Sequence, residues 1–246
     1  TYSRPQLTNI IAFNLGNPTS SEKKIVSICG ESSEIMYMAE RSIYLTSTNY
    51  DSQKGDTYTT IRKIFVRKNR IIPFADGKIR GTLNNQFSLD EYGPYLRVAA
   101  TLNKNGQNSN SVYTLGYYMR PYGELSNIAP GERIFSARYV NKRLYMVTFR
   151  QVDPFFVISL ANHKRPKILG ELKVPGFSRY LHPYDEETII GFGRQADSNG
   201  REEGLKVSLF DVSDVNQPKE LAKMEVEEKY ANSKAEWEHK AFLFSL

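Results

Sequence analysis

Residues 131–178 alternate short apolar stretches with polar turns, in the order expected of antiparallel strands. The apolar stretches are rich in β-branched and aromatic side chains, which favour a pleated sheet. Asn141–Arg143, Asp153–Pro154 and Ala161–Arg165 have the composition of turns. The strands predicted from this pattern are 134–140, 144–149, 155–160 and 167–174. We therefore expect residues 131–178 to form one four-stranded antiparallel unit.

The four predicted strands differ in their hydrophobic pattern. LYMVTF (144–149) and FFVISL (155–160) are apolar at successive positions, as in strands that are covered on both faces of a sheet. Residues 167–174 alternate instead, so one side of that strand is expected to face water. Buried middle strands and a half-exposed outer strand suit a blade stacked between two others in a β-propeller. An ordinary β-sandwich also buries its central strands, and this unit alone does not separate the two.

Repeats along the chain favour the propeller. FFVISLANHKRPKILGELKV (155–174) aligns without a gap with VSLFDVSDVNQPKELAKMEV (207–226), at an offset of 52 residues. A Phe-Ser pair recurs at 87, 135 and 177, near the start of successive units. Repeats of about 40–50 residues are typical of four-stranded blades. We expect an all-β propeller with about four full blades and two partial ones.

The array also predicts how the chain is divided. The full units are 33–83, 87–130, 132–175 and 176–228, with one partial unit at 8–30 and another that opens at EWEHKAFLFSL (236–246). We expect residues 1–246 to be one domain and a piece of a longer chain. A ring that lacks blades exposes apolar blade faces, so we also expect self-association through the incomplete blades.

Composition narrows the function classes. Formal net charge is +6, but Lys and Arg are scattered among Asp and Glu, which is typical of a solvated surface rather than of a nucleic-acid interface. No apolar run is long enough to span a membrane as a helix. Cys29 is the only cysteine, so neither an intrachain disulfide nor a cysteine-rich metal site is possible. We predict no cofactor.

Several long segments resemble a known family. These segments are NQFSLDEYGPYLRVAAT (85–101), APGERIFSARYVNKRLYMVTFRQVDPFFVISL (129–160), LGELKVPGFSRYLHPYDEETIIGFGR (169–194), GLKVSLFDVSDVNQPKELAK (204–223) and EHKAFLFSL (238–246). They are similar to secreted bacterial and archaeal proteins with a C-terminal β-propeller domain, which are distantly WD40-like. The resemblance implies a propeller fold and an extracellular or surface-anchored location. It implies no activity, and the chain departs from the family at Ser159 and Glu238, where the family has Asp.

Polar residues near the starts of the units are the candidate channel lining. They are Asp90, Glu91, Arg138, His182, Glu238 and His239. Asp90 and Arg138 lie three residues after the Phe of their unit, and His182 lies five after, so regular strands would point all three the same way. That pattern suits a ring of ion pairs, which is the simpler interpretation, or a small binding site. We expect the lone Trp237 to be a core residue.

Two polar stretches, 103–110 and 195–204, are expected to be solvated loops between the second and third strands of a unit. In the second stretch, Asp197, Asn199, Glu202 and Glu203 carry oxygen atoms suited to calcium, but they lack the spacing of an EF-hand loop. A structural calcium site there is one hypothesis, and we predict no other metal site.

Function is left with two main hypotheses. The chain is either a non-enzymatic interaction module that binds a protein or glycan at the cell surface, or a hydrolase or oxidoreductase with a polar site in the channel. The second needs a base and an acid in reach of each other, with Asp90 or Glu91 and His182 as the candidates. None of the common nucleophile, zinc or phosphate-binding motifs occurs. The first hypothesis is therefore preferred.

Overall fold

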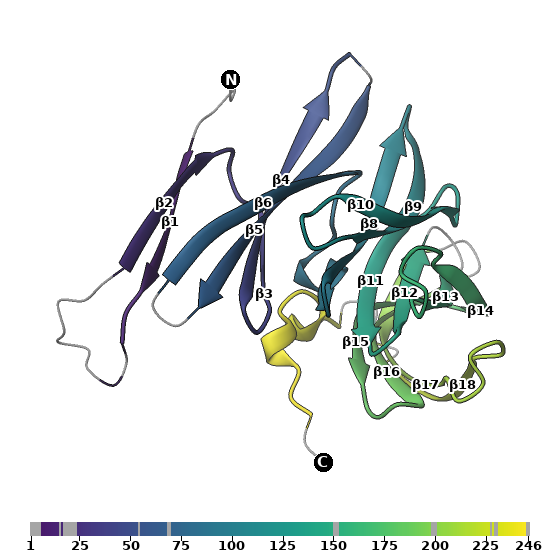
Figure 1. Ribbon diagram of the computed structural model, residues 1–246. Coiled ribbons are helices and arrows are strands. Elements are labelled where there is room, and N and C mark those ends of the chain that lie inside the picture. Colours follow the sequence, from purple (N-terminus) through teal and green to yellow (C-terminus); the bar gives the residue numbers. More distant parts are fainter. Residues whose placement is uncertain are drawn as a thin grey trace.

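The computed structural model is built almost entirely of strands (Figure 1). It describes residues 6–14, 16, 24–53, 55–67, 70–149, 153–197, 201–226, 228 and 231–244. These residues form four four-stranded antiparallel sheets, which we call blades 1 to 4, and a two-stranded sheet, which we call the half-blade. The all-β prediction, with four full units and a partial one before them, is confirmed. Within the described part of the chain, no helix is long and apolar enough to cross a membrane.

Each blade takes four consecutive strands of the chain, paired in sequence order. The half-blade consists of β1 (Gln6–Ala12) and β2 (Lys24–Gly30). Blade 1 consists of β3 (Ile35–Met38), β4 (Ser42–Asp51), β5 (Asp56–Arg67) and β6 (Arg70–Arg80). Blade 2 consists of β7 (Leu89–Tyr92), β8 (Tyr95–Lys104), β9 (Gln107–Leu115) and β10 (Pro121–Ile128). Blade 3 consists of β11 (Arg133–Val140), β12 (Arg143–Phe149), β13 (Asp153–Ser159) and β14 (Lys167–Val174). Blade 4 consists of β15 (Phe177–Pro183), β16 (Thr188–Ala196), β17 (Glu202–Asp211) and β18 (Lys219–Val226).

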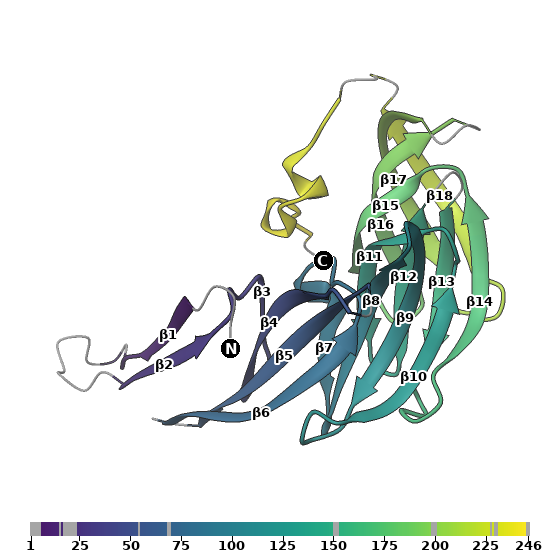
Figure 2. The ribbon, with the colours of Figure 1, turned by 90° about the horizontal axis from the view of Figure 1, so that it is seen from above.

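The blades stand side by side in an arc. Seen from above, the half-blade and blade 4 lie at opposite ends of this arc, and the C-terminal segment crosses its concave side (Figure 2). We call residues 231–244 the C-terminal arm. It contains two single-turn 3-10 helices, Lys234–Glu236 and His239–Ala241. The first strand of each full blade is nearest to the arm, so parts of the chain that are far apart in sequence share one space.

Apolar side chains fill the contacts between successive blades. Tyr44 and Ile61 of blade 1 pack with Val98 and Leu115 of blade 2 in one cluster. Two further clusters join blade 2 to blade 3 and blade 3 to blade 4, and a fourth joins the half-blade to blade 1. The middle strands therefore need apolar residues on both faces, as predicted for 144–149 and 155–160. A blade removed from the array would lose much of its buried surface, which is the main stabilising contribution.

Blade 3 shows how well the pattern predicts the strands. Its fourth strand begins and ends where expected, and the other three differ by one or two residues. A β-bulge interrupts the pairing of β11 between Ile134 and Ser136, and a similar one lies between Ser178 and Tyr180 of β15. These first strands are therefore not regular, and counting residues from the Phe-Ser pairs does not fix which way a later side chain points.

Two expectations about local structure were wrong. Residues 103–110 are not a loop, because β8 and β9 pair as far as Lys104 and Gln107. Asn105 (φ 52°) and Gly106 (φ 79°) make the two-residue turn that an Asn-Gly pair favours. The stretch after residue 236 was expected to open a further blade, but as far as Phe244 it forms 3-10 turns and extended chain rather than a paired strand.

Candidate functional site

The blades and the arm enclose a cavity of about 560 Å³ on the concave side of the arc, which we call the axial cavity. Every full blade contributes to its wall near its first strand, and the arm supplies the remaining side. The lining residues are 34–36, 84–87, 133–135, 179–180, 235–237 and 239. A concave site built from several rigid elements is the usual form of a binding site.

The walls of the axial cavity mix aromatic and polar side chains. Phe87 and Tyr180 lie close together, with ring centroids 5.8 Å apart. Trp237 lines the same cavity and leaves 67% of its surface exposed. Arg133 stacks over the ring of Phe135 at 4.7 Å. Such walls offer flat apolar surfaces and hydrogen-bonding groups side by side, which suits a ligand with both kinds of surface.

A buried ion-pair cluster holds the arm in place. Glu236, whose side chain is 1% exposed, accepts hydrogen bonds from Arg194 Nε at 2.6 Å and Nη2 at 2.8 Å. Its Oε1 also lies 3.6 Å from Nε of Arg179, and Nη2 of Arg179 donates to Glu202 at 2.9 Å. Hydrogen bonding to Glu236 raises the pKa of the Arg194 guanidinium. Because β15, β16 and β17 supply the other three members, the cluster fixes the arm to blade 4.

The backbone of the arm supports the same arrangement. Ser233 caps the first 3-10 turn and accepts from the amide of Ala235, while Glu236 accepts from the amide of Ser233. Arg194 Nη1 donates to the carbonyl of Ala231 at 2.7 Å. This capping box places Glu236 toward blade 4 and leaves the next residue, Trp237, at the surface.

A second cavity of about 350 Å³ adjoins the axial cavity, and Met36, Gln86 and Phe87 line both. We call it the side cavity. Asp90 and Arg138 both line it, so the structure brings together two of the six residues predicted to line the channel. Arg138 Cζ lies 3.9 Å from the ring centroid of Phe87, which lines both cavities.

Asp90 and Glu91 each have a structural partner. Asp90 accepts from Arg97 Nε at 2.8 Å, and Arg97 is 1% exposed. Burial raises the pKa of Asp90, and the Arg97 charge opposes that shift. Glu91 points elsewhere, where it accepts a hydrogen bond from the Tyr44 hydroxyl and lies 3.5 Å from Nζ of Lys63. Burial and Glu91 together raise the pKa of Tyr44.

Arg138 and His182 meet at Tyr180. Arg138 donates from Nε to the carbonyl of Leu181 at 2.8 Å, and burial lowers its pKa. His182 Nδ1 lies 3.2 Å from the Tyr180 hydroxyl, and its ring packs on Phe242 of the arm. Burial and the Arg138 charge lower the pKa of His182.

His239 lies in the axial cavity, with its Nε2 3.2 Å from Nε2 of Gln86 and its ring edge-on to Phe87. Glu238 is half exposed and caps the turn that contains His239. Neither histidine makes a hydrogen bond or ion pair with Asp90 in the described structure. The six predicted residues therefore do not form one cluster, and whether any of them binds a ligand stays a prediction.

The calcium candidates are described only in part, so a calcium site there stays a prediction. Asn199 lies outside the described residues. Asp197 accepts from the amide of Arg201 at 2.8 Å, and Glu202 pairs with Arg179. Among the residues that the structure describes, no group of three or more His, Cys, Asp or Glu side chains is placed to hold a metal ion.

Sequence reasoning missed the arm residues that complete the site. Trp237 was expected in the core, yet it is among the most exposed large side chains. The overlooked signal is Ser233 followed three residues later by Glu236, which is the pattern of a capping box at the start of a helical turn. The partners of Glu236, Arg179 and Arg194, carry no local signal because β15 and β16 bring them there.

Four consecutive four-stranded sheets, packed face to face with their first strands on the concave side, define a β-propeller array. The family model described as "Beta propeller domain" matches residues 1–246, so the chain belongs to that family. It is 42% identical over 169 residues to an uncharacterized protein of Methanocaldococcus jannaschii, covering 68% of this chain and 26% of that protein. It is 38% identical over 224 residues to an uncharacterized protein of Archaeoglobus fulgidus, covering 85% of this chain and 34% of that protein. The chain thus spans about a quarter to a third of these relatives.

Two solved structures align with part of this chain. One is the subtype N10 neuraminidase-like protein of A/little yellow-shouldered bat/Guatemala, with a TM-score of 0.48, 9% identity and coverage of 85% of this chain and 76% of that one. The other is the β-propeller domain of the Trilobed protease from Pyrococcus furiosus, with a TM-score of 0.45, 10% identity and coverage of 80% and 59%.

Proposed function

We propose that the chain is a non-enzymatic interaction module that holds a protein or glycan in the axial cavity. The observation that carries the proposal is the convergence of all four blades and the arm on one cavity of about 560 Å³. Rigid blades keep these wall residues in fixed positions, so a ligand finds them already arranged. Trp237 gives the cavity an exposed aromatic surface of the kind that often anchors a partner.

The charges in the cavity favour recognition over chemistry. Arg179 and Arg194 are balanced by Glu202 and Glu236, so their charges are used in holding the arm. The acid–base candidate Asp90 is held by Arg97 and does not contact His182. Turnover in a broad hydrolase and oxidoreductase screen, lost in His182→Ala with the fold intact, would favour an enzyme instead.

The proposed location is extracellular or at the cell surface. It rests on the resemblance of residues 85–246 to secreted propeller proteins, and it fits a partner that is presented at a surface. Protease treatment of intact cells that carry the native protein checks it. Digestion without lysis supports a surface location, and protection until lysis contradicts it.

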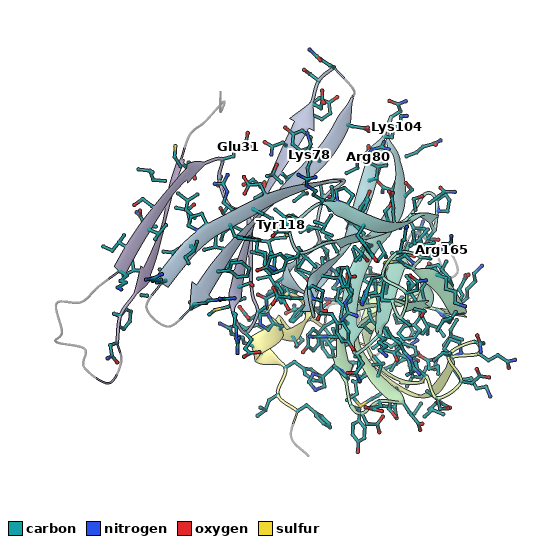
Figure 3. All side chains as sticks on the ribbon, viewed as in Figure 1. Glu31, Lys78, Arg80, Lys104, Tyr118 and Arg165 are labelled. Atoms are coloured by element: carbon teal, nitrogen blue, oxygen red, sulfur yellow. The ribbon has the colours of Figure 1, made fainter. Side chains whose placement is uncertain are left out.

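Binding is tested with a panel of immobilised oligosaccharides and peptides, using Trp237→Ala and Tyr118→Ala. These residues are 67% and 66% exposed, so the two substitutions remove similar exposed aromatic surfaces. Tyr118 lies beside β5 and β6, away from the arm (Figure 3). We expect ligands retained by the unsubstituted chain to be lost with Trp237→Ala and kept with Tyr118→Ala. Equal retention by both variants contradicts the proposal.

A further inference from the structure

Arg138 is a half-buried cation whose neighbours are all neutral. Its strand, β11, belongs to blade 3, which has blade 2 packed on one side and blade 4 on the other. Nε donates to the carbonyl of Leu181 at 2.8 Å. Cζ lies 3.9 Å from the ring centroid of Phe87 and 5.1 Å from that of Tyr180. Within the described ranges, no carboxylate forms an ion pair with this guanidinium.

Other cations that are withdrawn from water have an acid partner. Four cationic side chains that are at most 12% exposed each lie within 4.0 Å of a carboxylate. The pairs are Lys63 with Glu91, Arg97 with Asp90, Arg194 with Glu236 and Lys206 with Glu220. Removing a charge from water is costly unless an opposite charge compensates it. The chain meets that requirement at these four sites and does not meet it at Arg138.

The pKa shifts agree with this contrast. Hydrogen bonding to Glu236 raises the pKa of the Arg194 guanidinium. Burial lowers the pKa of Arg138, and among the described residues only the Tyr180 side chain opposes that shift. Arg138 stays protonated near neutral pH, because the ordinary pKa of a guanidinium is far higher. It therefore carries a positive charge that its surroundings do not balance.

The side cavity is the space that this charge faces. Its volume of about 350 Å³ is at the small end of the range for ligand sites. Asp90 also lines it, but that carboxylate already accepts from Arg97 at 2.8 Å. One positive charge is left over, so a monoanion matches the cavity. A phosphate dianion would instead bring excess negative charge close to Asp90.

The remaining walls of the side cavity are largely apolar. Met36 and Met38 lie two residues apart on β3, so they share one face of that strand, and they are 60% and 62% exposed. Leu89 and Phe87 add further apolar surface. Methionine side chains adapt to ligands of varied shape. These walls suit a ligand with a short apolar body beside its charged group.

We propose that the side cavity binds a carboxylate group on Arg138, with the apolar body of the ligand against Met36 and Met38. A guanidinium has several N–H donors, and those on Nη1 and Nη2 match the two oxygens of a carboxylate. The carboxylate belongs either to a free short acid or to a larger ligand in the axial cavity, because Met36, Gln86 and Phe87 line both cavities. The proposal does not rest on the proposed function, since a free acid can bind while the axial cavity is empty.

The first test is nuclear magnetic resonance of the 246-residue chain with labelled methionine methyl groups, titrated with butyrate. We expect saturable shifts of the Met36 and Met38 signals and none of Met224, which is 62% exposed on β18. Butyramide has a similar shape without the charge, and it should bind at least about tenfold more weakly. Equal binding of acid and amide, tighter binding of inorganic phosphate, or equal shifts of all three methionines would overturn the proposal.

Two substitutions on the same strand separate Arg138 from the rest of the site. Arg138→Met removes the charge and keeps a long side chain, and it should weaken butyrate binding at least about tenfold. Arg133→Met removes an exposed guanidinium that stacks on Phe135 in the axial cavity, and it should leave the affinity unchanged. Equal butyrate affinities in these two variants contradict the proposal.

His182 reports on the same charge without any substitution. Burial and the Arg138 charge lower its pKa, so a carboxylate bound to Arg138 should raise that pKa toward its ordinary value. His163 is the matched control, because its pKa is lowered by burial and by the charges of Arg97 and Lys142. A pKa of His182 that stays the same in saturating butyrate contradicts binding at Arg138.

Two more samples separate this site from the axial cavity and from other parts of the protein. Trp237→Ala should bind butyrate as tightly as the unsubstituted chain, because Trp237 lines the axial cavity and not the side cavity. Weaker binding in that variant would overturn a separate site. The complete natural protein should bind butyrate as well, and loss of binding there would show that another segment already occupies Arg138. Competition between butyrate and a ligand retained from the panel indicates a carboxylate carried by that ligand, and binding without competition indicates a free acid.

Discussion

Removing the Glu236 carboxylate should release the C-terminal arm from blade 4. The carboxylate is 1% exposed and pairs with Arg194 through two hydrogen bonds of 2.6 and 2.8 Å. Removing one partner of a buried ion pair costs about 3–5 kcal/mol, because the remaining charge is left without compensation. The Arg194 side chain is 12% exposed and can regain some water, so we expect Glu236→Ala to cost about 3 kcal/mol, at the low end of that range.

Trp237 makes this release measurable, because it is the only tryptophan and follows Glu236 directly. We expect its fluorescence anisotropy to fall in Glu236→Ala, and the amides of the arm to exchange faster with solvent. Glu238→Ala is the control. It removes a half-exposed carboxylate that caps a turn and makes no contact with Arg179 or Arg194 in the described structure, and such a cap is worth about 1 kcal/mol. Equal anisotropy in the unsubstituted chain and Glu236→Ala would refute the view that this cluster holds the arm.

Three further predictions concern the blades. Arg97→Ala removes a guanidinium that is 1% exposed, and it should lower the free energy of unfolding, measured with denaturant, by about 3–5 kcal/mol. The control Arg80→Ala removes an exposed guanidinium and should lower it by at most about 1 kcal/mol. The pKa of His182 is lowered in the folded chain, so the unfolded chain binds that proton first and stability should fall as the pH drops below about 6.5. His182→Gln should flatten part of that slope in melting temperature against pH. Gly193→Ala should lower the melting temperature, because a Cβ at that position would lie 1.9 Å from a backbone oxygen. Gly116→Ala should leave it unchanged, because the nearest atom to a Cβ there is 3.8 Å away.

The sequence predicted the blades well because each strand carries its own hydrophobic pattern. The runs 144–149 and 155–160 are apolar on both faces because blades pack on both sides of them. That requirement is visible in the residues of each strand alone. The repeat at 207–226 then extends that conclusion to blade 4. The Asn105–Gly106 pair is itself a sequence signal for a tight hairpin, although a loop was predicted there.

The site was less predictable because its geometry depends on bulges and on long-range contacts. The bulges in β11 and β15 change which way later side chains point, so Arg138 shares a cavity with Asp90, whereas His182 meets Arg138 at Tyr180. Trp237 was expected in the core, because a lone tryptophan usually is. The Ser233–Glu236 capping pattern indicates a helical turn, but it does not show that Glu236 pairs with Arg194 of blade 4. Pairing of strands far apart in the sequence decides those positions.

Hydrogen exchange of the chain with a retained ligand tests the central claim most directly. If the blades and the arm build one binding site, the ligand should slow exchange together in five segments. These segments contain the lining residues 34–36, 84–87, 133–135, 179–180, and 235–237 with 239. Slower exchange confined to the outer strands or to a single hairpin, with these segments unchanged, would contradict the account.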